Sequence, residues 1–188
     1  MLLALADPPF HGLLFIPCFY LAVTAHELGH LAAGKLAGLD TGGISVGGFV
    51  VLRSGRNWTF RFDRSLWAGG FVKPLTKGAG ADPSRHVWFV AGGPGASVLL
   101  TAFAGWMWVS HPTSLFVLGL SVIPFSSGLN KSDGARLWQL WRQPERARSL
   151  IAGLALQTEE AKGVRPREWN PQTFEQFLEA DASASDYA

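Results

Sequence analysis

The chain has 188 residues, of which 48% are hydrophobic and only 16% are charged, and its mean hydropathy is +0.17. This composition excludes a mainly disordered chain, and the net charge of +2 is too small to indicate a nucleic-acid partner. The single cysteine, Cys18, excludes an internal disulfide framework and a cysteine-rich metal site. Eight tryptophans are typical of a protein at a membrane interface.

The first predicted element is an apolar segment over about residues 9–36, which is long enough to cross a membrane. A signal peptide is the alternative, because residues 22–25 are similar to a cleavage site. However, no basic residue precedes Lys35, so the positively charged start of a signal peptide is missing. We therefore predict a transmembrane helix.

The next segment, residues 35–85, is a polar connection with eight basic and three acidic residues. Apolar side chains alternate over 44–52 and again from Trp58 to Phe62, and turn-forming residues separate the two runs. This pattern predicts a β-hairpin over about 44–63. The hairpin is either a packing cap or an edge strand that pairs with an extended peptide. The glycine-containing stretch 68–72 is expected to lead back toward the membrane.

Two further spans are predicted, at 86–108 and 113–130, because no Asp, Glu, Lys or Arg occurs between Arg85 and Lys131. The last span is expected to break near Pro124 and to resume as a helix at Ser132 or Asp133. Broken backbone at membrane depth is tolerated only inside protein or beside water, so this break indicates a site.

The sequence thus predicts a mainly α, polytopic membrane protein. A three-helix transmembrane core with a β-hairpin insertion takes up residues 1–142, and a soluble helical tail takes up 143–188. Asn170 and Pro171 are typical of a helix start in that tail. Since positive charge is retained inside, the basic loop and the tail are expected in the cytoplasm and the N-terminus outside.

The segment His26-Glu27-Leu28-Gly29-His30 is an H-E-x-x-H motif within the first span. On a helix this spacing puts both imidazoles on one face, where they can share a metal ion. Glu27 can then take a proton from metal-activated water. The alternative is a structural polar cluster between helices. Because such groups are costly in lipid, intramembrane ionisable residues indicate function by default.

A catalytic zinc ion requires a third protein ligand. The extended metzincin pattern is excluded, since Leu36 stands where it needs a histidine. No glutamate occurs between Glu27 and Glu145. Asp133 follows the broken span and opens a helix, which makes it the candidate; Asp40 or a histidine at a span end is the alternative.

Three segments, taken together, are similar to those of a known family: residues 26–30, the run Ala91-Gly92-Gly93-Pro94-Gly95-Ala96-Ser97, and the run Ser132-Asp133-Gly134-Ala135-Arg136-Leu137. Over residues 10–142 the chain resembles the site-2 protease family of intramembrane zinc metalloproteases, especially short bacterial members. The resemblance implies one Zn²⁺ held by His26, His30 and Asp133, with Glu27 as general base. It implies hydrolysis of peptide bonds within or near transmembrane segments of membrane-protein substrates, in the bilayer of a bacterial cytoplasmic membrane.

Two positions depart from the family pattern. Ser97 and Ser121 stand where the family usually has asparagine, and the resemblance assigns these two residues and Gly93 to substrate binding. For Gly93 and Gly95, close helix packing is the alternative. A catalytically silent scaffold or chaperone of the same fold is the alternative function, and a transporter fits poorly without an inverted repeat. A regulatory membrane partner is left open.

Overall fold

The computed structural model describes residues 8–54, 57–76, 83–107, 111–127 and 130–185. Within these ranges the chain is mostly helical, which confirms the mainly α class predicted from the sequence. The α-helices are α1 (Pro8–Leu36), α2 (Pro83–Met107), α3 (His111–Val122), α4 (Asp133–Arg142), α5 (Pro144–Ala161) and α6 (Pro171–Ser185). Two 3₁₀ helices, η2 (Arg64–Leu66) and η3 (Pro166–Glu168), lie in the connections.

Two of the three predicted spans are long and apolar enough to cross a membrane: Leu14–Leu36 in α1 and Pro83–Phe103 in α2. The third predicted span, over 113–130, is not confirmed: it contains a shorter apolar helix, α3, which ends at Val122. Its 12 residues extend about 18 Å, against a hydrocarbon core of about 30 Å. Pro124 ends the helix, since proline lacks an N–H and disfavours helical backbone just before it.

The helix that follows the break begins at Asp133, as predicted, and Ser132 is its N-cap. Between α3 and α4 the chain forms a short antiparallel pair, β5 (Ser126–Ser127) with β6 (Asn130–Lys131). The break predicted near Pro124 is therefore confirmed.

The segment between α1 and α2 forms a four-stranded antiparallel sheet in the order β3-β2-β1-β4. Its strands are β1 (Asp40–Val46), β2 (Phe49–Ser54), β3 (Asn57–Phe62) and β4 (Gly70–Leu75). The predicted pairing across residues 54–57 is confirmed by β2 and β3, although the centre of that turn, 55–56, lies outside the described residues.

One strand predicted over 44–52 is instead two. Gly47 and Gly48 have φ angles of 60° and 84°, and this left-handed backbone makes the turn between β1 and β2. The stretch expected to lead back toward the membrane contains the start of β4, which pairs with β1.

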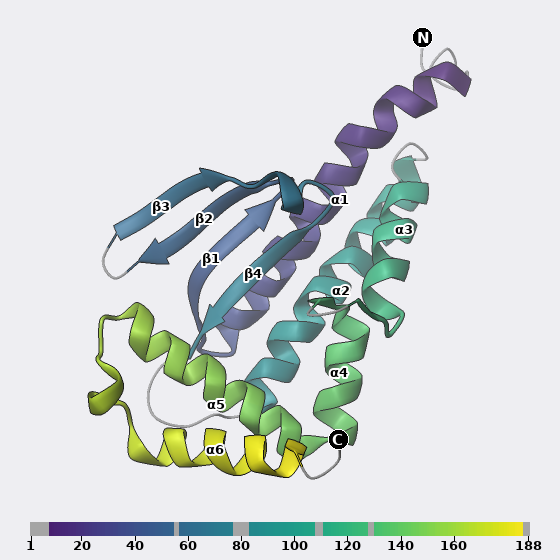
Figure 1. Cartoon of the computed structure of the whole chain (residues 1–188). Coiled ribbons are helices and arrows are strands. Elements are labelled where there is room, and N and C mark those ends of the chain that lie inside the picture. The colour runs from purple at the N-terminus through teal and green to yellow at the C-terminus, as the bar shows by residue number, and fades with distance from the viewer. Residues whose placement is uncertain (1–7, 55–56, 77–82, 108–110, 128–129, 186–188) are drawn as a thin grey trace.

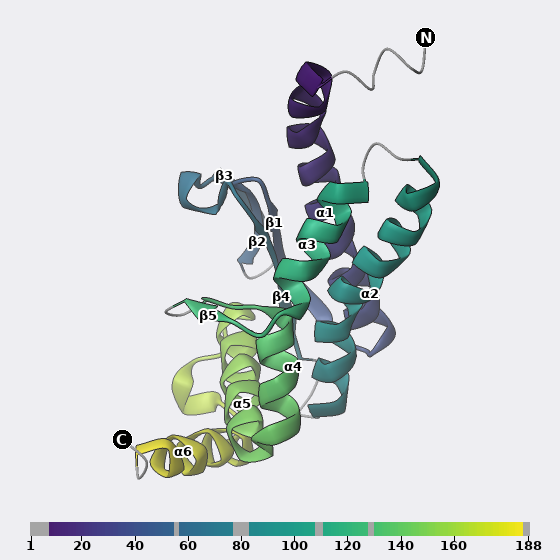
Figure 2. The same ribbon diagram turned by 90° about the vertical axis from the view of Figure 1, so that its right-hand side faces the viewer.

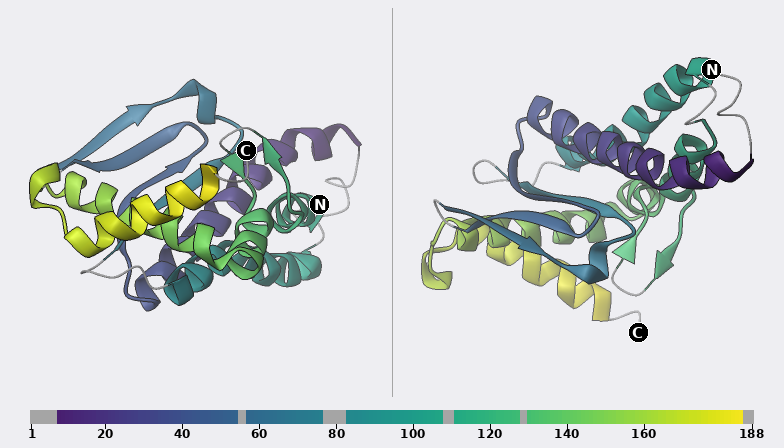
Figure 3. Two further views of the ribbon diagram at one scale, coloured as in Figure 1. Left: turned by 60° about the horizontal axis from the view of Figure 1, so that its bottom comes forward. Right: turned by 90° about the horizontal axis from the view of Figure 1, so that it is seen from above.

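The sheet lies along α1 (Figure 1). The hydroxyl of Tyr20 donates a hydrogen bond to the carbonyl of Trp67 at 2.9 Å, and a Cβ atom on Gly47 would lie 2.7 Å from the Tyr20 ring. At the other end of the sheet, the N–H of Thr76 donates to the hydroxyl of Thr158 in α5 at 3.2 Å. Helices α5 and α6 pack against each other beside this end of the sheet (Figure 3).

Two apolar clusters hold α1 in place, one on each side of the H-E-x-x-H motif along the helix. One contains Ala22 and Val23 of α1 with Val117 of α3. The other joins the sheet and α2 just beyond the end of α1; its buried members are Leu39, Val72, Phe89 and Val90. The motif between them therefore lies on a well-packed part of α1, a helix that lies beside α2 and α3 (Figure 2).

Helices α1 and α2 touch at backbone distance. A Cβ atom on Gly29 would lie 2.5 Å from Cβ of Ala96, and closer still to the carbonyl oxygen of Gly92. Small residues permit such an approach. The contact places the motif of α1 directly against the glycine-rich run of α2.

Candidate metal centre

Three potential metal ligands meet where α1, α2 and α4 converge. Nε2 of His26 lies 3.2 Å from Nε2 of His30, one helical turn further along α1. Oδ2 of Asp133, the first residue of α4, lies 2.9 Å from Nε2 of His26 and 3.4 Å from Nε2 of His30. Both imidazoles are buried, and Asp133 is half-buried. Residues that are 107 positions apart in the chain thus share one site.

These distances fit a tetrahedral zinc site. Ligand atoms about 2.0–2.1 Å from zinc stand about 3.3 Å apart along the edge of a tetrahedron. The three measured separations bracket that length. Two imidazole nitrogens and one carboxylate oxygen are also the donor types of a catalytic zinc site, which leaves a fourth position open. His26, His30 and Asp133 can therefore hold a metal ion.

The hydrogen bonds of the other ring nitrogens orient both imidazoles. Nδ1 of His30 lies 2.8 Å from the carbonyl oxygen of Phe89, and a carbonyl only accepts hydrogen bonds. Nδ1 therefore carries the proton, and Nε2 presents its lone pair to the shared site. Nδ1 of His26 lies 2.8 Å from the hydroxyl of Ser97, which is fully buried in α2.

Gly93 leaves the space beside these nitrogens open. A Cβ atom at this position would lie 2.6 Å from Nε2 of His26 and would overlap Nε2 of His30. A side chain here would fill the cradle that the ligand atoms form. The absence of a side chain at residue 93 thus fits a site that holds a metal ion.

Asp133 is held by the residues on each side of it. The hydroxyl of Ser132 donates to the carbonyl of Ile123 at 2.7 Å and accepts from the N–H groups of Phe125 and Ala135. Gly134 lies so close to the end of α3 that a Cβ atom would overlap the carbonyl of Val122. These contacts fasten the start of α4 to the end of α3.

The carboxyl group of Asp133 is ionised. Burial raises its pKa, but hydrogen bonds and charge interactions with His26 and His30 outweigh burial and hold the pKa below its usual range. An anionic ligand complements a divalent cation.

Glu27 is buried against the sheet. A Cβ atom on Gly70, at the start of β4, would lie 2.7 Å from Cγ of Glu27. Within the part of the chain that the structure describes, Oε2 of Glu27 is buried without a hydrogen-bond partner. Such a group is costly unless it has a function or a missing partner. This carboxylate is thus available to exchange a proton.

Comparison with known families decides the assignment. The sequence profile of peptidase family M50 matches residues 14–186. The chain belongs to this family, that of the site-2 proteases. Comparisons with curated proteins and with solved structures gave no match. The M50 peptidases are zinc metalloproteases and are typically membrane-associated.

As an M50 peptidase, the chain brings most of its predicted site residues together. His26, His30 and Asp133 meet, and Gly93 and Ser97 contact the imidazoles. The hydroxyl of Ser121 instead donates to the carbonyl of Leu118 within α3. Close packing of α1 on α2 is instead the role of Gly29 and Gly92, whereas a Cβ atom on Gly95 would meet nothing within 4 Å among the described residues.

Sequence reasoning missed three contacts of this M50 site. The carbonyl of Phe89 is a backbone group, so no residue type could have revealed it. Ser132 carries an N-cap signal in Ser-Asp-Gly, which predicted the helix start but not the bond to Ile123. Gly70 follows another glycine, and this pair is the only sign of its close approach to Glu27.

Proposed function

We propose that this M50 peptidase is an intramembrane zinc endopeptidase that hydrolyses peptide bonds within or near transmembrane segments of membrane proteins. The observation that carries the proposal is the tetrahedral spacing of the His26, His30 and Asp133 ligand atoms beside Glu27, whose Oε2 is buried without a hydrogen-bond partner among the described residues. Two of these ligands lie on a helix long enough to cross a membrane.

The residues divide the chemistry between them. His26, His30 and Asp133 would hold the zinc ion, which when bound would supply a water molecule of lowered pKa and polarise the substrate carbonyl. Glu27 would accept a proton from the attacking water as the oxygen of that water bonds to the carbonyl carbon, after which the peptide C–N bond would break. Glu27 returns the proton to the departing amine nitrogen. Phe89 and Ser97 keep the imidazoles oriented throughout, because their hydrogen bonds lie on the far side of each ring.

The outer edge of β4 is a suitable place for the substrate backbone. In the described part of the chain β4 pairs only with β1, so its other edge is unpaired. Its first residue, Gly70, packs on Glu27. A helical substrate must unwind before its peptide bonds are accessible, and an extended segment can pair with such an edge. We therefore favour the edge-strand role of the sheet over a packing cap, with β4 as the strand concerned.

The orientation that we propose places the loop over residues 35–85 and the C-terminal tail in the cytoplasm, in a bacterial cytoplasmic membrane. Positive charge near the ends of spans resists translocation, and this loop carries most of the excess of basic over acidic residues. A Ser54→Cys variant in a Cys18→Ala background tests it. Labelling of intact cells by a membrane-impermeant thiol reagent would contradict the proposal; labelling only after permeabilisation supports it.

The decisive experiment is Glu27→Gln in purified, lipid-reconstituted protein. The amide cannot accept the proton of the attacking water, so cleavage of a transmembrane substrate should fall by about 10²–10⁴-fold. Zinc content should remain, since Glu27 is not among the three ligands. A silent scaffold would show no zinc-dependent cleavage in either protein. A fully active variant would remove the proposed mechanism.

A further inference from the structure

Helix α4 has an exposed aromatic and basic surface at the end far from Asp133. Trp138 and Trp141 are 53% and 71% exposed. The guanidinium carbon of Arg142 lies 4.7 Å from the centre of the Trp138 ring and 4.9 Å from that of Trp141. On α2, the helix whose Val87 lines the hollow beside Trp141, Trp88 is 69% exposed. We call Trp88, Trp138, Trp141 and Arg142 the α4 surface.

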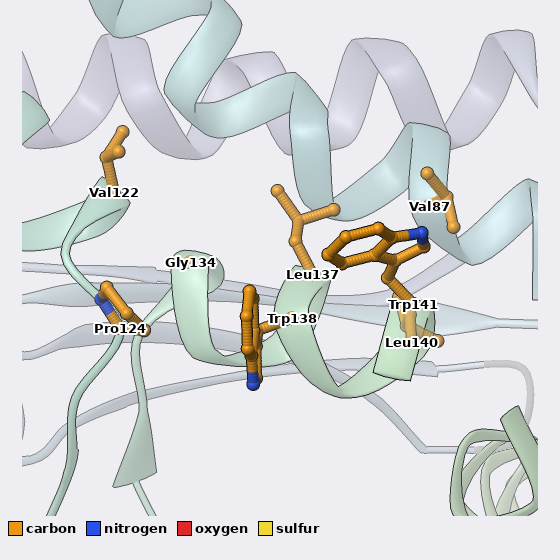
Figure 4. Close-up of a pocket in the computed structure, with 8 residues that line it drawn as sticks. All are labelled: Val87, Val122, Pro124, Gly134, Leu137, Trp138, Leu140 and Trp141. Carbon is orange, nitrogen blue, oxygen red and sulfur yellow. The ribbon is translucent and has the colours of Figure 1, made fainter. Parts of the chain in front are cut away.

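An apolar hollow of about 600 Å³ lies beside this surface, between α2, the end of α3 and α4. Figure 4 shows Val122 and Pro124 at one end of the hollow, and Val87 and Trp141 at the other. The metal ligands are not among its lining residues, although Gly134, which follows Asp133, is. A second hollow shares Pro124 and Trp138 and adds Lys131.

The α4 surface and the end of α1 lie at similar distances along their helices from the metal centre. Along α4, Trp141 is eight residues from Asp133, or about 12 Å. Along α2, Trp88 is five residues from Gly93, or about 8 Å. Helix α1 ends six residues beyond His30, about 9 Å away. These helix ends lie at the same end of the molecule (Figures 1 and 2).

We propose that the α4 surface binds an anionic phospholipid at the membrane boundary, with the headgroup on Arg142 and the upper acyl chain in the apolar hollow. The proposal rests on the membrane location given above. Its consequence is that α4 fixes the depth of the third metal ligand, because Asp133 and the lipid contact lie on one ten-residue helix.

Charge and aromatic content favour this occupant. Residues 131–142 contain three basic side chains, and their single acidic residue, Asp133, is engaged by the imidazoles. In the described part of the chain, Arg142 has no ion-pair partner. Its planar guanidinium can bind a phosphate group in a bidentate manner while it stacks on an aromatic ring. Tryptophan favours the headgroup level of the bilayer.

The first test measures depth. The full chain is placed in nanodiscs whose phosphatidylglycerol carries bromine either near the top or near the middle of the acyl chain. The fluorescence of Trp138 and Trp141 is obtained as the difference between the unmutated protein and a Trp138→Phe/Trp141→Phe variant. This fluorescence should be quenched mainly by the shallow bromine. Trp58→Phe on β3 is the matched control. Equal emission in brominated and unbrominated lipid would overturn the proposal. It would show that both indoles are shielded from lipid, for example by a second copy of the chain or by a peptide helix.

The second test measures lipid choice. Native mass spectrometry of protein released from mixed phosphatidylglycerol and phosphatidylcholine nanodiscs should show retained phosphatidylglycerol. Arg142→Gln should lower that retention about fivefold, whereas Arg61→Gln on β3 should not. Equal retention in the Arg142 variant would overturn the proposal.

Zinc content, measured on the same preparations, separates this proposal from the proposed function. Zinc-loaded protein without lipid contact at the α4 surface would overturn the lipid site and leave the metal centre standing. Lipid contact in protein that binds no zinc would support the lipid site and contradict the zinc enzyme.

Discussion

Gly93 of α2 lies against Nε2 of His30, so closely that a Cβ atom at residue 93 would overlap this nitrogen. The contact joins the glycine-rich run to the H-E-x-x-H motif across two helices. It also makes the space beside the ligands sensitive to one added methyl group.

Gly93→Ala should weaken zinc binding about tenfold or more, because overpacking at a fixed site costs about 1–3 kcal/mol. Gly95→Ala, two residues further on, is the matched control, since a Cβ atom there meets nothing within 4 Å among the described residues. Zinc affinity measured by competition with a chelator distinguishes the two. Equal affinities in both variants would show that Gly93 does not border the metal.

Asp133→Ala should lower zinc occupancy together with activity, because two imidazoles alone hold zinc weakly. Asp63→Ala should leave zinc occupancy and activity unchanged, since the carboxylate of Asp63 accepts hydrogen bonds from Ser65 at the start of η2 and is not one of the three ligands. Metal analysis of the purified variants is the measurement. Normal zinc content in Asp133→Ala would contradict Asp133 as the third ligand and would leave Asp40 or a histidine at a span end as the candidate.

Ser97→Ala should reduce zinc affinity about 10–100-fold, the usual effect of losing the group that orients a ligand imidazole. Ser97→Asn should retain most of the affinity, because the amide oxygen can accept from Nδ1 of His26 and the amide is the family's usual group. Ser114→Ala, an equally buried serine on α3, is the control. Failure of Ser97→Asn to fold would identify Ser97 as a packing position instead.

Ser132→Ala should destabilise the start of α4 and thereby weaken zinc binding. Loss of an N-cap costs about 1 kcal/mol, and the stranded carbonyl of Ile123 adds about 1–3 kcal/mol. Ser132→Thr keeps the hydroxyl and should restore zinc affinity. A thermal unfolding curve recorded with and without zinc gives both quantities. The idea fails if Ser132→Ala binds zinc as tightly as Ser132→Thr.

The H-E-x-x-H motif predicted two ligands because helical spacing alone puts His26 and His30 on one face. Asp133 could be predicted only because the polar, broken stretch after Pro124 indicated a helix start at the right depth. The contact between His26 and Ser97 could not, since it depends on how α1 and α2 cross. The crossing is set by the contact of Gly29 with Gly92, and neither segment alone shows which residue of the other helix its glycine will contact.

The errors in the fold have local causes. The alternation over 44–52 continued through Gly47 and Gly48, so a strict period of two concealed the turn, although paired glycines are a turn signal. A third span was predicted because apolar residues continue to Phe125. Helix α3 stops at Val122, since Pro124 overrides hydropathy.

The contact between Gly29 and Gly92 also determines from which side a peptide can reach the ligands. With the backbones of α1 and α2 already touching at the motif, no chain can slide between these two helices. The side of the site between α1 and α2 is therefore closed to a peptide. In the proposed reaction the peptide would instead approach past the start of β4, where Gly70 packs on Glu27. Two residues without side chains, Gly29 and Gly92, would thus restrict the direction from which a substrate approaches.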